Sequence, residues 1–236
     1  MKWCLILILS IVQSAMAFDG LVPWQWQQSR CQDCGIYIKI KPEFAVQLDP
    51  RVEQFIAALE NQKRPLVDLY GIDPQEYNLL AWMSIGILGR ESSFFEGIRY
   101  QIKELAPPLV RIAKKVEALR DGKKISENSR GPTQIKKVPS LIQYAYGIEV
   151  EDLVEPDKAA VATMGFLIEA LAELKQRAKN NGRAEITPDK YVDYLPYIYF
   201  GQAQKISNGQ AQPNKNAYIQ EMKAHMKKFE IFEVIY

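Results

Sequence analysis

The segment from Pro74 to Glu91 constrains the fold of this 236-residue chain more than any other part of the sequence. Its apolar residues cover nearly all sides of a helix: Tyr77, Leu79, Leu80, Trp82, Met83, Ile85 and Leu88. A helix that is hydrophobic all round belongs inside a protein core. Asp73 is a favourable N-cap residue, and proline is favoured directly after it. We therefore expect a buried helix that starts at Pro74 and ends near Glu91.

Helical periodicity continues along most of the chain. Further helices are predicted from Pro50, over residues 109–119, 138–145 and 156–178, from Thr187, and over 218–229. An alternating stretch, Gly35 to Ile40, predicts a strand or hairpin arm within an otherwise irregular region. The expected fold class is mainly α, with an irregular N-terminal arm over residues 18–50 and one main domain over residues 51–236.

The N-terminus has the features of a secretory signal peptide. Met1-Lys2 forms a short positive region, Trp3 to Val12 is almost wholly apolar, and Ala15-Met16-Ala17 is a cleavage signal. An apolar run of roughly 10 residues is too short to span a bilayer, which takes about 20. We expect cleavage after Ala17, a periplasmic or secreted mature chain, and no membrane span within it.

Composition excludes several classes of function. The formal charge of +2 falls to +1 when Lys2 is removed, which argues against a nucleic-acid partner. Cys31 and Cys34 form a C-x-x-C pair that fits a redox site, a metal site or a small disulfide. Zinc takes about four ligands and His225 is the only histidine, so a local disulfide is favoured. We expect no metal, no cofactor and a monomer.

Two short motifs carry the candidate chemistry. Glu91-Ser92-Ser93-Phe94 ends the apolar helix, and Gly131 to Ile135 reads Gly-Pro-Thr-Gln-Ile. A glutamate in apolar surroundings keeps its proton to higher pH and can serve as a general acid. The two serines are candidates for hydrogen bonds to that carboxyl or to a sugar. On local sequence alone, Glu91 also fits an exposed charge paired with Arg90 or Arg99.

Over residues 75–205 the chain resembles the lytic transglycosylase and goose-type lysozyme superfamily. That superfamily has an E-S-x-F motif, then G-x-M-Q-I, then Y-N-x-G, and the chain has Glu91 to Phe94, Gly131 to Ile135 and Tyr199-Phe200-Gly201 in the same order. The resemblance implies a lysozyme-like helical domain with a substrate groove. It implies that Glu91 is the catalytic acid/base, that Gln134 lines the groove and that Tyr199 approaches Glu91. Ser92 and Ser93 are the other expected substrate-binding residues.

The resemblance implies cleavage of the MurNAc-GlcNAc β-1,4 bond in peptidoglycan glycan strands. A lytic transglycosylase needs one carboxyl, because the C6 hydroxyl of the substrate attacks, whereas a lysozyme hydrolyses the bond. The alternatives are a non-catalytic cell-wall-binding protein and a glycosidase for a chitin-like or deacetylated amino-sugar polymer. The chain departs from the motifs at Thr133 and Phe200, and the segment 96–128 is long. We expect that segment to form an extra wall of the groove.

Overall fold

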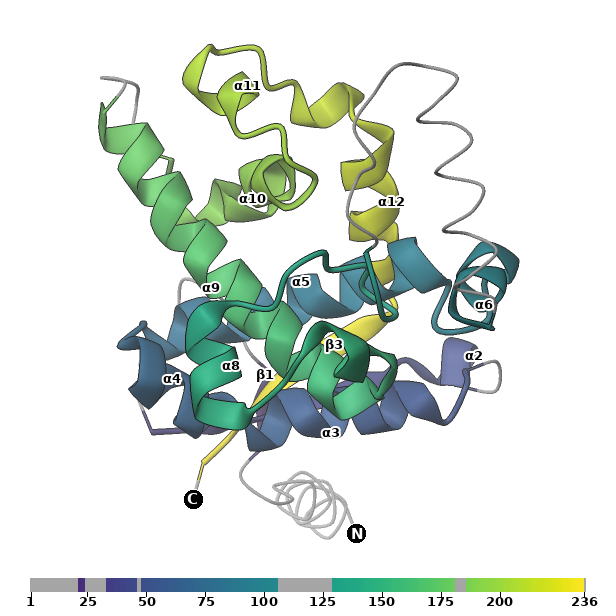
Figure 1. Ribbon diagram of the computed structural model, residues 1–236. Helices are drawn as coiled ribbons and strands as arrows, with labels where there is room; N and C mark the ends of the chain where they lie inside the picture. Colours follow the sequence, from purple (N-terminus) through teal and green to yellow (C-terminus); the bar gives the residue numbers. More distant parts are fainter. Residues whose placement is uncertain (1–20, 24–32, 46–47, 106–128, 181–185, 236) are drawn as a thin grey trace, which may run out of the picture.

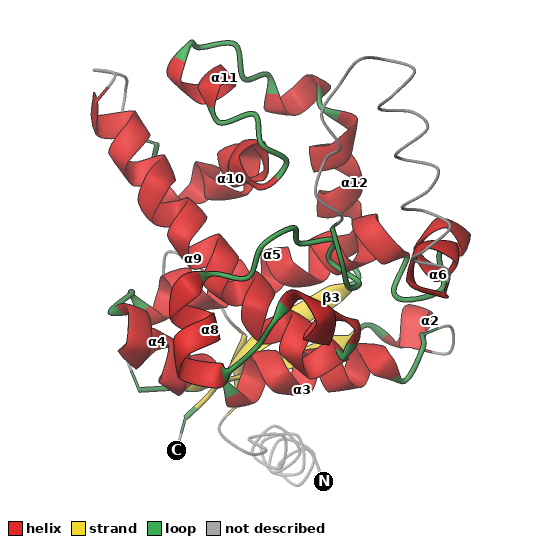
Figure 2. Ribbon diagram, viewed as in Figure 1, coloured by secondary structure: helices red, strands yellow, loops and turns green. Residues whose placement is uncertain are grey.

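The computed structural model describes residues 21–23, 33–45, 48–105, 129–180 and 186–235 (Figure 1). The predicted signal peptide over residues 1–17 and the helix predicted over 109–119 lie outside these ranges. The described chain is mainly α-helical, as the periodicity predicts, and it carries one small sheet (Figure 2).

The α-helices of the described chain are α2 (Pro42–Ala45), α3 (Arg51–Asn61), α4 (Lys63–Tyr70), α5 (Pro74–Ser92), α6 (Ile98–Leu105), α8 (Ser140–Tyr146), α9 (Pro156–Asn180), α10 (Tyr191–Tyr199), α11 (Gln204–Ser207) and α12 (Ala217–Met226). Short 3-10 turns are η1 (Val150–Val154), η2 (Pro188–Lys190) and η3 (Pro213–Lys215). The helices predicted from Pro50, from Pro74 and over 156–178 are confirmed as α3, α5 and α9. The sequence reading did not predict α4 or α6.

Helix α5 lies at the centre of the helical part and crosses the middle of the view in Figure 1. The Asp73 side chain caps its start by accepting a 2.7 Å hydrogen bond from the backbone N–H of Gln75. Buried residues cover nearly its whole length, from Tyr77 to Gly89, as expected for a helix that is apolar all round. Helices α9 and α12 pack against it.

Small residues let α12 approach α5 closely. A Cβ atom added to Gly86 would lie 2.9 Å from the backbone oxygen of Met222, and one added to Gly89 would lie 2.5 Å from the His225 ring. The Trp82 indole N–H donates a 2.8 Å hydrogen bond to the backbone oxygen of Met226. The two helices therefore run past each other in opposite directions, and the start of α12 meets the end of α5.

The sheet joins the two ends of the chain. Its order is β1 (Leu21–Pro23), β3 (Phe229–Val234) and β2 (Gly35–Ile40), and both pairings are antiparallel. The predicted strand at Gly35 to Ile40 is confirmed as β2. The helix predicted over 218–229 is wrong at its end, because α12 stops at Met226 and residues 229–234 form the central strand.

Burial alternates along β3, as it does in a strand with one face on the core. Phe229, Ile231 and Glu233 are buried, and the residues between them are more exposed. Glu233 is buried and accepts hydrogen bonds from Gln75 at 2.9 Å and from Asn78 at 3.0 Å. These bonds tie the C-terminal strand to the first turns of α5.

Candidate active site

Glu91 lies in the last turn of α5, one residue before the helix ends. The turn before it contains Ile87 and Leu88, and neither has any exposed surface. Glu91 itself is partly exposed. A rigid buried helix therefore brings this carboxyl to the point where the helix meets the surface.

The chain leaves α5 through an unusual turn at Ser93, Phe94 and Phe95. All three have left-handed backbone conformations, with φ of 49°, 57° and 71°. Non-glycine residues in this region cost roughly 1–2 kcal/mol each. Buried rings offset that cost: Phe94 packs 5.2 Å from the His225 ring, and Phe95 has no exposed surface. Packing of the two phenylalanines thus holds the turn that follows Glu91.

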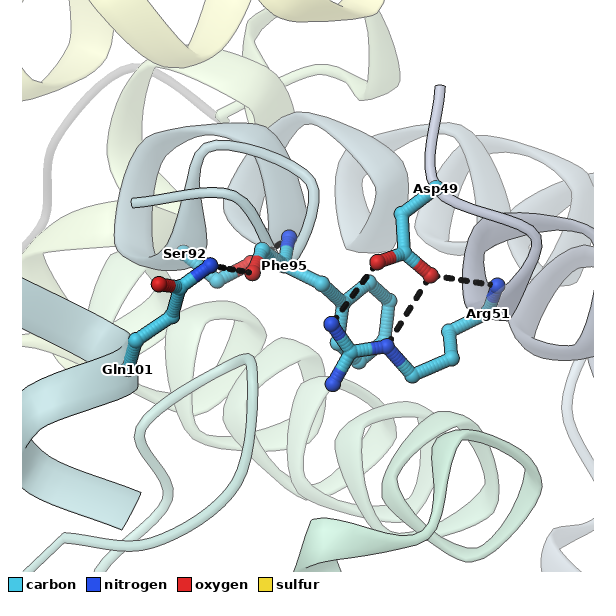
Figure 3. Close-up of polar contacts among 5 residues, drawn as sticks. All are labelled: Asp49, Arg51, Ser92, Phe95 and Gln101. Atoms are coloured by element: carbon cyan, nitrogen blue, oxygen red, sulfur yellow. Dashed lines mark hydrogen bonds and ion pairs between the residues drawn. The ribbon is translucent and has the colours of Figure 1, made fainter. Parts of the chain in front are cut away.

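The Phe95 ring is also covered by a charged side chain. The guanidinium carbon of Arg51 lies 4.7 Å from the ring centre, and Asp49 holds that guanidinium with contacts of 2.9 and 2.7 Å (Figure 3). The ring also meets the Tyr100 ring edge-on, with the ring centres 5.9 Å apart. The start of α3 and the start of α6 therefore meet at the turn that ends α5.

Ser92 and Ser93, which are both predicted to bind substrate, have different surroundings in the structure. The Ser92 hydroxyl donates a 2.7 Å bond to the backbone oxygen of Leu88. It accepts a 3.2 Å bond from the Phe95 N–H (Figure 3). Only 1% of Ser92 is exposed, and its hydroxyl stabilises the helix end. Ser93 is exposed, and its role in substrate binding stays a prediction.

The second motif forms a tight turn over residues 129–135, called here the 129–135 turn. Arg130 and Ile135 form a β-bridge at its base, with the Arg130 N–H 2.8 Å from the Ile135 oxygen. Thr133 is buried, and its hydroxyl lies 2.8 Å from the Thr163 hydroxyl of α9. Thr163 donates its own proton to Ala159, so Thr133 donates to Thr163. This bond accounts for threonine at position 133.

Both the nitrogen and the oxygen of the Gln134 side-chain amide form hydrogen bonds. Its Nε2 donates a 2.6 Å bond to the backbone oxygen of Gly131. Its Oε1 accepts from the Ser129 hydroxyl at 3.2 Å and from the Lys103 ammonium of α6. The backbone of Gln134 is left-handed, with φ of 57°. The turn therefore presents one fixed orientation of the predicted groove residue.

Gly131 should be the least replaceable residue of the 129–135 turn. Its φ is +71°, and an added Cβ would lie 2.1 Å from the backbone oxygen of Leu153. We expect Gly131→Ala to destabilise the fold by more than the roughly 1–2 kcal/mol of left-handed strain, as measured by denaturant unfolding. Gly147→Ala is the matched control, because Gly147 has φ of +65° with nothing within 4 Å. Equal losses in both variants would refute the close contact.

Tyr199, the last residue of α10, connects the turn to the carboxyl. Its hydroxyl donates to the backbone oxygen of Thr133, and its ring packs edge-on against Phe166 of α9 at 5.3 Å. Burial raises the pKa of Tyr199 well above its ordinary value, and the charge of Glu91 adds to the rise. Tyr199 therefore stays protonated and lies within electrostatic reach of Glu91.

Tyr218, at the start of α12, is a site residue that the sequence reading missed. Its buried hydroxyl reaches no partner at full hydrogen-bond geometry, yet it lies near enough to the Glu91 carboxyl to lower the pKa of that group. Its ring packs 5.3 Å from Phe200 and 5.1 Å from the Arg90 guanidinium carbon. Phe200, which departs from the family motif, thus helps to position Tyr218.

Burial dominates the protonation of Glu91. It raises the carboxyl pKa above the ordinary value of 4.5, while the Tyr218 hydroxyl and the charges of Arg90 and Lys103 partly oppose the rise. Arg90 itself pairs with Glu221 of α12 at 2.5 Å. The surroundings of Glu91 therefore differ from those of a surface charge paired with Arg90, and they favour a carboxyl that holds its proton.

This shift predicts how stability responds to pH. A carboxyl whose folded-state pKa is raised stabilises the fold below its unfolded pKa, and that contribution is lost as pH rises through the folded value. Glu91→Gln removes the titration, so the stability of the variant relative to the wild type should increase as the pH rises above the ordinary carboxyl value of 4.5. Thermal unfolding of both proteins over a series of pH values measures the difference. A difference that does not change with pH would contradict the raised pKa.

Other features of the described chain add little chemistry. Within the ranges above, no group of three or more His, Cys, Asp or Glu side chains is arranged to hold a metal ion. No helix in those ranges is both long and apolar enough to cross a bilayer. Cys34 is disulfide-bonded, and Cys31 lies outside the described residues.

Comparisons with protein-family models, characterised proteins and solved structures find no match to this chain.

Proposed function

We propose that this protein is a peptidoglycan-cleaving glycosidase with a lysozyme-like fold, in which Glu91 is the general acid/base. The substrate bond is the β-1,4 link between MurNAc and GlcNAc in a glycan strand. The predicted signal peptide supports a periplasmic or secreted site of action, where such strands are found.

One observation carries the proposal: the predicted site residues come together around a single carboxyl. Glu91 at the end of α5 lies within electrostatic reach of Tyr199 at the end of α10. Tyr199 in turn donates to Thr133, the neighbour of Gln134 in the 129–135 turn. These residues are far apart in sequence, and the order of the motifs alone did not require them to meet.

The protonation of this cluster suits an acid. A carboxyl whose pKa is raised by burial keeps its proton nearer to neutral pH and can deliver it to the leaving oxygen of a glycosidic bond. Both Tyr199 and Tyr218 have pKa values raised well above the ordinary value of 10, so they remain hydroxyl donors beside it. The charges that act on Glu91 within the described chain are cationic, from Arg90 and Lys103.

The intramolecular route needs no acid/base other than Glu91. Glu91 protonates O4 of the leaving sugar as the C1–O4 bond breaks. The C6 hydroxyl of MurNAc forms the new bond to C1, and its proton passes to the Glu91 carboxylate, which restores the acid. The product is a 1,6-anhydromuramoyl end. An attacking hydroxyl already tethered to the reacting sugar lowers the entropic barrier.

The products decide between this route and hydrolysis. Purified sacculi are digested with the protein, and the soluble fragments are divided into two portions, of which one is treated with borohydride. We expect fragments that borohydride leaves unchanged in mass, because an anhydro end has no reducible aldehyde. A gain of two hydrogens on each fragment would assign hydrolysis by water. Absence of soluble fragments would remove the glycosidase proposal.

A further inference from the structure

Helix α6 supplies two charged residues to the candidate site. Lys103 donates a 2.6 Å hydrogen bond to the Ser129 hydroxyl and another to the Gln134 amide oxygen. The next residue, Glu104, accepts a 3.1 Å bond from the backbone N–H of Gly131. Two adjacent side chains of α6 therefore bind the 129–135 turn. Glu104 binds the backbone N–H of Gly131, and Lys103 binds the side-chain amide of Gln134. Helix α6 belongs to the long segment between the two motifs, which the family pattern does not account for.

We propose that Lys103 is a positioning residue of this site, which fixes the amide of Gln134 against Ser129 and places a positive charge beside Glu91. The inference rests on the proposed function, since Gln134 is the predicted groove residue and Glu91 the predicted acid. The inference gives α6 a role in the site, although no residue of α6 belongs to either motif.

The first part of the role is geometric. An amide has an oxygen that accepts and a nitrogen that donates, and rotation by half a turn exchanges them. The Lys103 ammonium can only donate, so it requires the oxygen of Gln134 to point toward α6. The nitrogen then points toward the backbone oxygen of Gly131, at 2.6 Å. A hydroxyl such as that of Ser129 can donate or accept, and it does not impose this orientation by itself.

The second part is electrostatic. The groups that face the Glu91 carboxyl are Arg90 from α5, Lys103 from α6, Tyr199 from α10 and Tyr218 from α12. Burial raises the pKa of Glu91, and the Lys103 charge lowers it. An acid/base must both give and regain a proton in each cycle, and a pKa raised without limit would slow the step in which Glu91 gives its proton. The positive charge of Lys103 therefore limits the rise in the Glu91 pKa that burial causes.

The test combines a direct titration with kinetics. The pKa of Glu91 is read from its side-chain carboxyl signal by ¹³C NMR in the wild type, Lys103→Met and Lys103→Arg. A positive charge favours the ionised form of a nearby carboxyl and so lowers its pKa. We expect the Glu91 pKa to rise in Lys103→Met and to stay near the wild-type value in Lys103→Arg. Lys39→Met removes the same charge from an exposed position on β2 and should change nothing.

Activity on sacculi supplies the second measurement. We expect Lys103→Met to lower kcat/KM by roughly tenfold to a hundredfold, because the Gln134 oxygen loses the ammonium that holds it and only the Gly131 oxygen still fixes the amide. The basic limb of its pH profile should move upward with the Glu91 pKa. Thermal unfolding checks that the variant is folded, and Lys103→Gln, which removes the charge but keeps a hydrogen-bond donor, serves as the test if it is not.

The two proposals fail in different ways. An unchanged Glu91 titration in a folded Lys103→Met variant overturns the role of Lys103, whatever the protein cleaves. If the titration shifts as expected but the wild type releases no sugar fragments, only the proposed function fails. A loss of activity in Lys103→Met without any change in the titration or the pH limb would indicate a purely structural contact and would also overturn the inference.

Discussion

Replacing Glu91 with glutamine should lower the rate of sacculus cleavage by about 10²- to 10⁴-fold, the usual contribution of a general acid. Glutamine keeps the size of the side chain and one oxygen, but it has no proton to deliver to the leaving group. The measurement is the initial rate of release of soluble fragments at fixed protein concentration. Because removal of the buried carboxylate relieves its desolvation, the variant should lose activity while it remains folded.

Glu96→Gln is the matched control for this loss. Glu96 lies five residues further along the chain and is exposed. It does not belong to the group of residues described around Tyr199. We expect its rate to stay within about twofold of the wild type, since an exposed carboxylate makes no contribution to proton delivery. If both variants lost activity equally, net charge would be the cause and Glu91 would have no special role.

The second large effect concerns stability. Phe95→Ala should reduce the free energy of unfolding by about 3–5 kcal/mol, the usual result of removing a buried phenylalanine. The ring has no exposed surface and contacts both Arg51 and Tyr100. Alanine would keep the left-handed backbone, with φ of 71°, and lose the packing that holds it. Denaturant unfolding monitored by circular dichroism gives the difference.

Ile98→Ala provides the comparison for Phe95→Ala. Ile98 is three residues away and 74% exposed, so its truncation should change the free energy of unfolding by less than about 0.5 kcal/mol. A loss at Phe95 as small as the loss at Ile98 would mean that the turn after α5 does not depend on its buried rings.

The sequence allowed the central helix to be predicted well. The pair Asp73-Pro74 marks a helix start by local chemistry, and apolar residues on all sides leave burial as the only stable outcome for α5. Helix α9 was predictable for similar reasons, with Pro156 at its start. These signals are local, so they do not depend on knowledge of what packs against each helix.

Other elements depend on distant parts of the chain. The apolar residues of 229–234 do not alternate strictly, and this strand depends on partners that come from Leu21–Pro23 and Gly35–Ile40. The helical pattern before them led to a helix prediction that ran three residues too far, to Phe229. The α6 helix is short, and two of its large apolar residues, Ile98 and Ile102, are exposed. Its apolar residues follow a helical spacing, but they do not mark a side that faces the core.

Some residues of the candidate site could likewise be predicted from the sequence, and others could not. The motifs identified Glu91, Gln134 and Tyr199, because each lies at a fixed position within a short recognisable pattern. Ser92 fits its motif too, but its hydroxyl satisfies the helix end, which only the backbone geometry reveals. Tyr218 and Lys103 lie in no motif. They reach the site because α12 and α6 pack beside the end of α5, a tertiary arrangement that no local pattern encodes.

The most direct test of the account is mass spectrometry of the fragments released from purified sacculi by the wild type and by Glu91→Gln in parallel. The account predicts muropeptides cut between MurNAc and GlcNAc in the wild-type digest, with their amount reduced at least about a hundredfold in the variant. Equal amounts in the two digests, or none from the wild type, would contradict it.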